Sequence, residues 1–348
     1  MLRFVLQMLR WLLGAVFIFS ATTKFIDPVG TSLFVDNYLA TYSLEALLPA
    51  SVALGVALSV AEFTLGTVLV VAVARRVVAL LSLLIVAIFT VVTLLSATIL
   101  PIGECGCFGE VVSLTPWGTF VKNVVLLFVA FIVWRTAKRG HVCRRDVVVL
   151  ILAVALSLGI NLYALNHQPL VDLMPYKVGT DLRSDVAKER EAEMLYSVLQ
   201  FRNMTTGAIE EFPADATTCW LRDDLEYVDV VTHTTSADSA KYSDFRVYDT
   251  EGEDVSERLL SRAGRVAWIT VYDAEAIDDE CIEAIHHIYD LYPSSAVVVL
   301  SAVADVDATL FPDTDIYSID AKTLRSINRA KVGVVVVNDG IVEYKDSL

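Results

Sequence analysis

The chain has 348 residues, of which 55% are hydrophobic, and its formal net charge is −15. A mean hydropathy of +0.57 and this apolar content exceed what soluble globular domains show. Residues 1–166 hold nearly all of the excess with 11 Lys and Arg against 7 Asp and Glu, whereas residues 167–348 carry 16 against 35. So acidic a second half excludes binding to a nucleic-acid backbone and is typical of a solvated surface. Five cysteines are too few for a disulfide scaffold.

Five apolar segments of the first half are long enough to cross a membrane. They cover residues 4–22, 47–74, 77–100, 117–137 and 147–165. The first resembles a signal peptide, but the further spans favour an uncleaved first helix. Thr115, Pro116 and Trp117 form a good start for the fourth span, as N-cap, first helical residue and interfacial aromatic residue.

Basic residues in the short loops predict the orientation of these spans. Arg75 and Arg76 separate the second and third spans, and five Lys or Arg residues separate the fourth and fifth. Loops rich in Lys and Arg stay in the cytoplasm. We therefore expect a multi-pass protein of the bacterial inner membrane, with a cytoplasmic N-terminus and a periplasmic C-terminal domain.

One carboxylate, Glu62, lies well inside the second span, and Lys24 and Lys122 lie near the ends of two others. A charge within a bilayer is costly and usually pairs or serves a function. The first interpretation is a structural pair of Glu62 with Lys24 or Lys122 near the outer surface. The alternative is that Glu62 handles protons.

Two cysteines, Cys105 and Cys107, lie in the sequence Gly-Glu-Cys-Gly-Cys-Phe-Gly at residues 103–109. A disulfide across one glycine is strained and therefore easily reduced, and the periplasm would allow it to re-form. At the level of the lipid headgroups the pair could also meet a membrane quinone. Alternatives are a permanent local disulfide and two packed thiols. The absence of a nearby histidine disfavours a metal site.

Several motifs of the membrane half occur together in one known family. They are Lys-Phe-Ile-Asp-Pro-Val-Gly (24–30), Ala-Glu-Phe-Thr-Leu-Gly (61–66), Glu-Cys-Gly-Cys-Phe-Gly-Glu (104–110) and Leu-Thr-Pro-Trp-Gly-Thr-Phe-Val-Lys-Asn (114–123). On these motifs, residues 1–140 resemble the MauE branch of the DoxX-like membrane family. The resemblance implies a four-helix module similar to vitamin K epoxide reductase-like proteins, with Cys105 and Cys107 as the redox pair. It also implies a link to methylamine utilisation, a thioredoxin-like partner and quinone-coupled oxidation.

The rest of the chain divides into three predicted regions. Residues 141–168 hold a basic cytoplasmic loop and the fifth span, and residues 169–243 form a β-rich linker with a hairpin over 194–212. Residues 244–348 read as strand, helix, strand, helix and hairpin, at 266–272, 279–291, 295–300, 321–330 and 332–344. This order resembles a thioredoxin-like domain, but the loop at 273–279 lacks Cys-x-x-Cys and the usual proline is missing. We therefore predict a binding domain in which Cys281 packs the helix.

The predicted fold is thus an all-α membrane bundle followed by an α/β domain. The favoured function is a redox accessory factor: Cys105 and Cys107 would relay electrons between extracytoplasmic thiols and a quinone, with Glu62 as proton or charge partner. The alternative is a non-catalytic, membrane-anchored assembly factor or scaffold. A transporter is disfavoured because no inverted repeat is visible. Expected partners are membrane lipid and an extracytoplasmic thioredoxin-like or client protein.

Overall fold

A computed structural model describes most of the chain as two compact units, residues 1–174 and 175–348, apart from one residue at the C-terminus that groups with the first. The described residues are 2–73, 75–99, 115–138, 143–165, 167–169, 171–213, 216–232, 241–242 and 244–348. Cys105 and Cys107 lie outside them.

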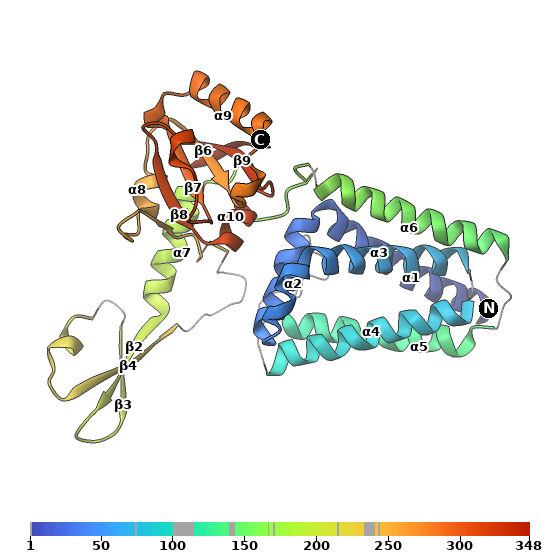
Figure 1. Cartoon of the computed structure of the whole chain (residues 1–348). Coiled ribbons are helices and arrows are strands. Elements are labelled where there is room, and N and C mark those ends of the chain that lie inside the picture. Colours follow the sequence, from blue (N-terminus) through green and yellow to red (C-terminus); the bar gives the residue numbers. More distant parts are fainter. Residues whose placement is uncertain are drawn as a thin grey trace. The chain divides into compact units, whose positions relative to one another are not determined.

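The first unit is a helical bundle (Figure 1). Its elements are α1 (Leu2–Ile26), α2 (Pro28–Thr41), the 3-10 helix η1 (Glu45–Ala50), α3 (Ser51–Val71), α4 (Arg75–Thr98), α5 (Pro116–Thr136) and α6 (Arg144–Leu165). Among the described residues, five helical stretches are long and apolar enough to cross a membrane, and they match the five predicted spans. The chain is therefore a multi-pass membrane protein.

Helix α2 was not predicted. Asp27 caps it by accepting a hydrogen bond from the Gly30 amide, and Pro28 occupies its first turn. Its 14 residues extend only about 21 Å, which is short of the hydrocarbon thickness of a bilayer. It therefore does not span, and it packs against α3.

Helices α1 and α3 cross at two glycines. A Cβ atom added to Gly66 would lie 2.8 Å from the carbonyl oxygen of Gly14, and one added to Gly14 would lie 2.9 Å from the carbonyl oxygen of Gly66. Such small residues let membrane helices approach closely. On its other side α3 contacts α6, where the Ser59 hydroxyl donates a hydrogen bond of 3.2 Å to the Asn161 side-chain oxygen.

The second unit contains a six-stranded sheet in the order β10-β9-β6-β7-β8-β5. The strands are β5 (Val247–Tyr248), β6 (Arg265–Val271), β7 (Val297–Ser301), β8 (Asp315–Ile319), β9 (Val332–Asn338) and β10 (Ile341–Ser347). β6, β7 and β8 are parallel, and β9 and β5 run antiparallel to their neighbours.

Helices cover both faces of this sheet. One face packs against α9 (Asp279–Leu291), through Cys281, Ile285 and Ile288. The other packs against α7 (Leu182–Tyr196), α8 (Ser256–Leu260) and α10 (Ala321–Ile327). The unit is therefore an α/β domain with two apolar cores, as the predicted fold class requires.

Several elements of the second unit were not predicted, among them α7, α8, β8 and β4 (Leu225–Thr232). The predicted hairpin is present as β2 (Ser197–Asn203) and β3 (Ile209–Pro213), and β4 adds to it in the order β3-β2-β4. Strand β8 lies between β7 and α10 in the chain, so the order departs from strand, helix, strand, helix and hairpin. The likeness to thioredoxin stays a prediction.

Candidate functional site in the membrane half

A buried ion pair joins α1 to α3. The Nζ atom of Lys24 lies 2.9 Å from Oε2 of Glu62, and the two side chains are 5% and 1% exposed. Lys24 Nζ also donates to the hydroxyl of Ser20 at 2.7 Å and to its backbone oxygen at 3.3 Å. The Lys24 ammonium is therefore held by acceptors on both helices, Ser20 on α1 and Glu62 on α3.

The local structure explains how both charges reach one point. Lys24 lies in the last turn of α1, and Glu62 lies one turn before Gly66, where α1 and α3 approach closely. The Thr31 hydroxyl lies 3.1 Å from the backbone oxygen of Lys24 and 3.0 Å from that of Asp27, which fixes the start of α2 against the end of α1.

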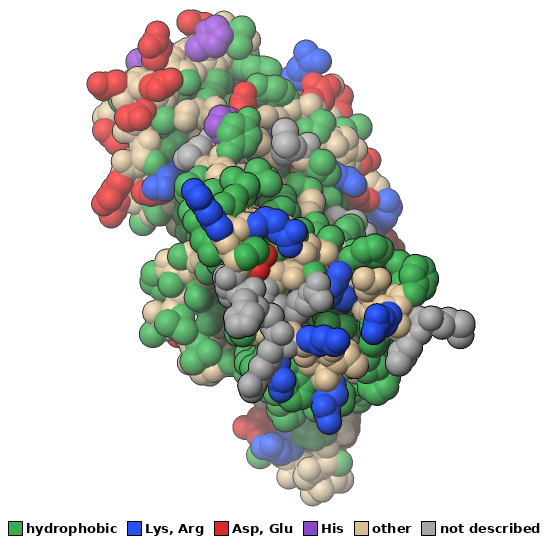
Figure 2. Space-filling model, turned by 90° about the vertical axis from the view of Figure 1, so that its right-hand side faces the viewer, with side chains coloured by type: hydrophobic (Ala, Val, Ile, Leu, Met, Phe, Trp, Pro, Cys, Tyr) green, Lys and Arg blue, Asp and Glu red, His purple; other side chains and the backbone are tan. Residues whose placement is uncertain are grey.

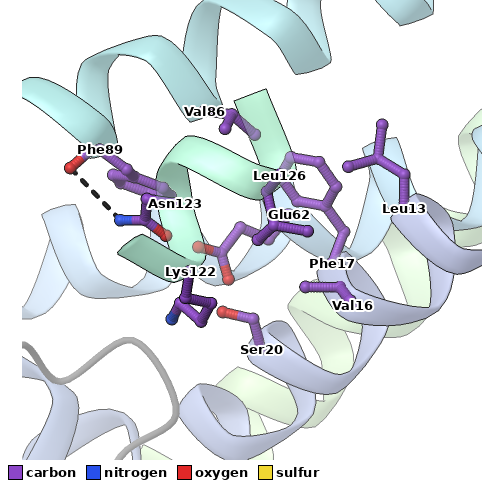
Figure 3. A pocket seen from close by; sticks show the side chains of 10 residues that line it. All are labelled: Leu13, Val16, Phe17, Ser20, Glu62, Val86, Phe89, Lys122, Asn123 and Leu126. Atoms are coloured by element: carbon purple, nitrogen blue, oxygen red, sulfur yellow. Dashed lines mark hydrogen bonds between the residues drawn. The ribbon is translucent and has the colours of Figure 1, made fainter. Parts of the chain in front are cut away.

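Two cavities meet at Glu62 and Phe89. The smaller one is also lined by Ser20, Lys122 and Asn123 (Figure 3). Asn123 Nδ2 donates to Phe89 O at 3.4 Å and to Thr93 Oγ1 at 3.2 Å, which joins α5 to α4. The larger cavity, of about 270 Å³, is bounded by α2, α3 and α4 and by Lys24 of α1.

The family comparison concerns the part of the chain that holds this arrangement. Residues 2–136 match the family model described as "Methylamine utilisation protein MauE". We call this segment the MauE-family domain. The comparison confirms the resemblance read from the sequence motifs. No curated protein and no solved structure matches the chain.

The MauE-family domain comprises α1 to α5, so that α6 and the second unit follow it. Every residue of the ion pair and of both cavities lies within it. Whatever chemistry this site performs therefore belongs to the family domain.

Of the residues singled out in the sequence, the structure brings Glu62 and Lys24 into contact. Lys122 lines the smaller cavity together with Glu62. The cysteine loop joins α4, which ends at Thr98, to α5, which Thr115 caps as predicted. Asn123 is eight residues beyond Thr115, about 12 Å along α5, and its side chain is buried.

Sequence reasoning missed the residues of α2 and Asn123. The dipeptide Asp27-Pro28 is a helix-start signal and could have revealed α2. Tyr38 and Tyr42 of this segment line the larger cavity, and their rings stack with centroids 6.4 Å apart. Asn123 had no comparable signal, because an amide within an apolar span does not reveal its partner.

One end of the bundle is basic (Figure 2). Arg3, Arg76, Arg135, Arg144 and Arg145 are exposed there. They belong to the start of α1, the start of α4, the end of α5 and the start of α6. The last residues of α4, up to Thr98, lie at the other end of this helix.

The described cysteines of the second unit are packed inside it. Cys219 and Cys281 are buried and free. The thiol of Cys281 donates to the Ala276 carbonyl oxygen at 3.6 Å, and burial raises its pKa. In the loop before α9, Asp273 pairs with Lys331 at 2.8 Å and Asp278 caps the helix. The two aspartates of this loop therefore have structural roles, in an ion pair and in a helix cap.

Proposed function

We propose that the chain is a redox accessory protein, in which Cys105 and Cys107 of the MauE-family domain relay electrons from extracytoplasmic thiols to a membrane quinone. The second unit is then the part that binds the client or partner protein. This proposal concerns a protein of the bacterial inner membrane with a cytoplasmic N-terminus.

The observation that carries the proposal is the buried pair of Lys24 and Glu62 beside two cavities. Burying both ions costs several kcal/mol each before their attraction is counted, and a bundle that only anchored a domain would need neither. Charged residues inside membrane proteins usually mark pathways for ions, protons or substrates. Glu62 is therefore a candidate proton acceptor for the thiol chemistry of Cys105 and Cys107.

The proposed reaction has two balanced steps. A client thiolate attacks one sulfur of the Cys105–Cys107 disulfide, and the client's second thiol then displaces the mixed disulfide. The client is oxidised and Cys105 and Cys107 become thiols. They regain their disulfide by giving two electrons and two protons to a quinone, with Glu62 as a proton acceptor on the way.

The redox state of the two cysteines in intact cells tests the proposal. Differential alkylation would be compared before and after quinone turnover is blocked. We expect the pair to shift towards thiols when quinone is blocked, because its oxidant is lost. A pair that stays fully oxidised or fully reduced in both conditions is structural and would refute the relay.

A second candidate function is a non-catalytic assembly factor or scaffold. It is favoured by the buried, free Cys219 and Cys281, since neither offers an accessible thiol to a client. Deletion of residues 169–348 separates the candidates. A scaffold loses all function on this deletion, whereas Cys105→Ser and Cys107→Ser leave it intact. A relay loses function with either cysteine change while the protein still inserts.

The proposed orientation rests on the basic end of the bundle, since basic loops stay in the cytoplasm. Cys143 is exposed just before α6 at this end. A membrane-impermeant maleimide should therefore label Cys143 in inverted membrane vesicles and not in intact spheroplasts. Labelling in spheroplasts would reverse the orientation.

A further inference from the structure

The larger cavity of the MauE-family domain has the size of a small ligand site. Its volume of about 270 Å³ exceeds the roughly 150 Å³ that holds a benzene ring in an engineered core. It lies just below the range typical of drug-sized ligands. Ile88 is part of the wall and is 60% exposed on α4. The cavity therefore reaches the lipid-facing surface of the bundle.

The walls of this cavity favour a planar, apolar ligand. Four aromatic side chains contribute to the lining, together with Val, Leu and Ile residues; the four are Phe34, Tyr38, Tyr42 and Phe89. Aromatic rings prefer stacked or edge-to-face contacts with other rings. A single aromatic ring with an alkyl substituent would match both the walls and the opening towards lipid.

The polar end of the cavity presents an acceptor. Lys24 and Glu62 both line it, but the ammonium already has acceptors in Ser20 and in Oε2 of Glu62. Glu62 accepts the hydrogen bond of Lys24 through Oε2, and a carboxylate has lone pairs for further donors on both oxygens. A ligand hydroxyl at this end of the cavity can therefore donate a hydrogen bond to the carboxylate.

A second polar atom lies at the cavity wall. The hydroxyl oxygen of Tyr42 is buried and lacks a hydrogen-bond partner among the described residues. A hydroxyl can donate and accept, so it suits a second ligand hydroxyl. A buried polar group without a partner is costly, and a ligand would remove this cost.

We propose that this cavity binds a lipid-soluble aromatic alcohol of the hydroquinone or phenol class, with one ligand hydroxyl donating to the Glu62 carboxylate and a second one bonded to the Tyr42 hydroxyl. It binds the hydroxyl form more tightly than the carbonyl form, because a quinone carbonyl would face a carboxylate and both are acceptors. The inference deepens the proposed function and rests on it for the ligand's redox role. In that role the site holds the reduced product before release.

The test measures binding in the full chain carrying Cys105→Ser and Cys107→Ser, so that no thiol reacts with the probes. The probes are an alkylated 1,4-benzohydroquinone, its dimethyl ether and the matching benzoquinone, titrated anaerobically by calorimetry into lipid nanodiscs. Heats from empty nanodiscs are subtracted. We expect the hydroquinone to bind at least about tenfold more tightly than the dimethyl ether, as befits a hydrogen bond to a charged group.

Two variants locate the binding. Glu62→Gln should remove most of the preference for the hydroquinone, and Tyr42→Phe should weaken its binding a few-fold without disturbing the ion pair. Asp146→Asn is the matched control, because it also turns a buried carboxylate into an amide but lies on α6, outside the cavity. It should change nothing.

Equal binding of the hydroquinone and its dimethyl ether would overturn the proposal, and so would a preference that survives both cavity variants. A third outcome is that the probes show no hydroquinone preference and bind more weakly in phosphatidylglycerol nanodiscs than in phosphatidylcholine nanodiscs. This outcome would overturn the proposal and assign the cavity to a lipid hydroxyl instead. If the chain with both Cys→Ser changes binds hydroquinone but Cys105 and Cys107 never change redox state in the alkylation assay, the binding site stands and the relay is rejected. If the cysteines do change redox state but no hydroquinone binds, the relay stands and the binding site is rejected.

Discussion

Removing one partner of the Lys24–Glu62 pair should destabilise the protein more than removing both. The two side chains are 5% and 1% exposed and 2.9 Å apart, so neither remaining charge could be solvated by water. Breaking a buried pair from one side costs about 3–5 kcal/mol, whereas replacing both ions by apolar residues is often neutral. We therefore expect such a loss of unfolding free energy for Lys24→Met and for Glu62→Leu, and a near-native value for the double variant.

The assay is reversible unfolding of the full chain in mixed micelles with increasing SDS, followed by circular dichroism. If the two residues act independently, the double variant loses as much unfolding free energy as the two single variants together. A coupled pair gives a double variant more stable than either single one. A charge exchange, Lys24→Glu with Glu62→Lys, should likewise recover part of the loss seen with Glu62→Lys alone.

Thr64 supplies the control on the same helix. Its hydroxyl oxygen is buried and has no hydrogen-bond partner among the described residues. Thr64→Val should therefore cost almost nothing, because it removes a polar atom and keeps the shape. Additive losses at Lys24 and Glu62, or a loss at Thr64 as large as theirs, would refute the reasoning from the ion pair.

Two further predictions concern packing and capping. Gly66→Ala places a Cβ atom 2.8 Å from a carbonyl oxygen of α1. It should lower the unfolding free energy by about 1–3 kcal/mol in the same SDS titration. The control is Gly159→Ala, whose Cβ atom would have nothing within 4 Å and which should not lower the unfolding free energy. Asp278→Ala should speed hydrogen exchange in α9, because Asp278 accepts the Cys281 amide hydrogen bond, and Asp279→Ala should do so much less. That hydrogen bond lowers the pKa of Asp278, so its contribution is complete above the ordinary pKa of an aspartate and is lost as pH falls through the lowered value. Wild type and Asp278→Ala should therefore converge in acid, and a difference that persists there would contradict the capping argument.

The sequence predicts the membrane half well because hydropathy alone separates its five spans. It does not predict α2, since 14 residues that include Thr, Ser, Asp and Asn side chains and a glycine near the start give no span signal. The ion pair could be anticipated because an intramembrane carboxylate requires a partner. The choice of Lys24 over Lys122 could not, since it depends on how closely Gly14 and Gly66 let α1 and α3 approach.

In the second unit the sequence predicts the central strands and misses elements at the periphery. β6, β9 and α9 are long and strongly patterned, and they lie where expected. β8 has only five residues, between a turn at Asp313 and the cap at Asp320, and two of its residues are exposed. α7 is polar over most of its length, so it reads as a linker until Leu182 and Val186 are seen to pack on the sheet.

The ion pair also constrains how the chain is made. Lys24 leaves the ribosome 38 residues before Glu62, so α1 emerges with its charge before α3 exists to neutralise it. A lysine at the end of a lone span can extend towards the headgroups. The charged end of α1 can therefore stay at the membrane interface until α3 has been synthesised. Once α3 arrives, the two spans can move inward together as a neutral hairpin. We expect the translocon to insert α1 and α3 as one cooperative step, with α2 left at the surface as the connection between them.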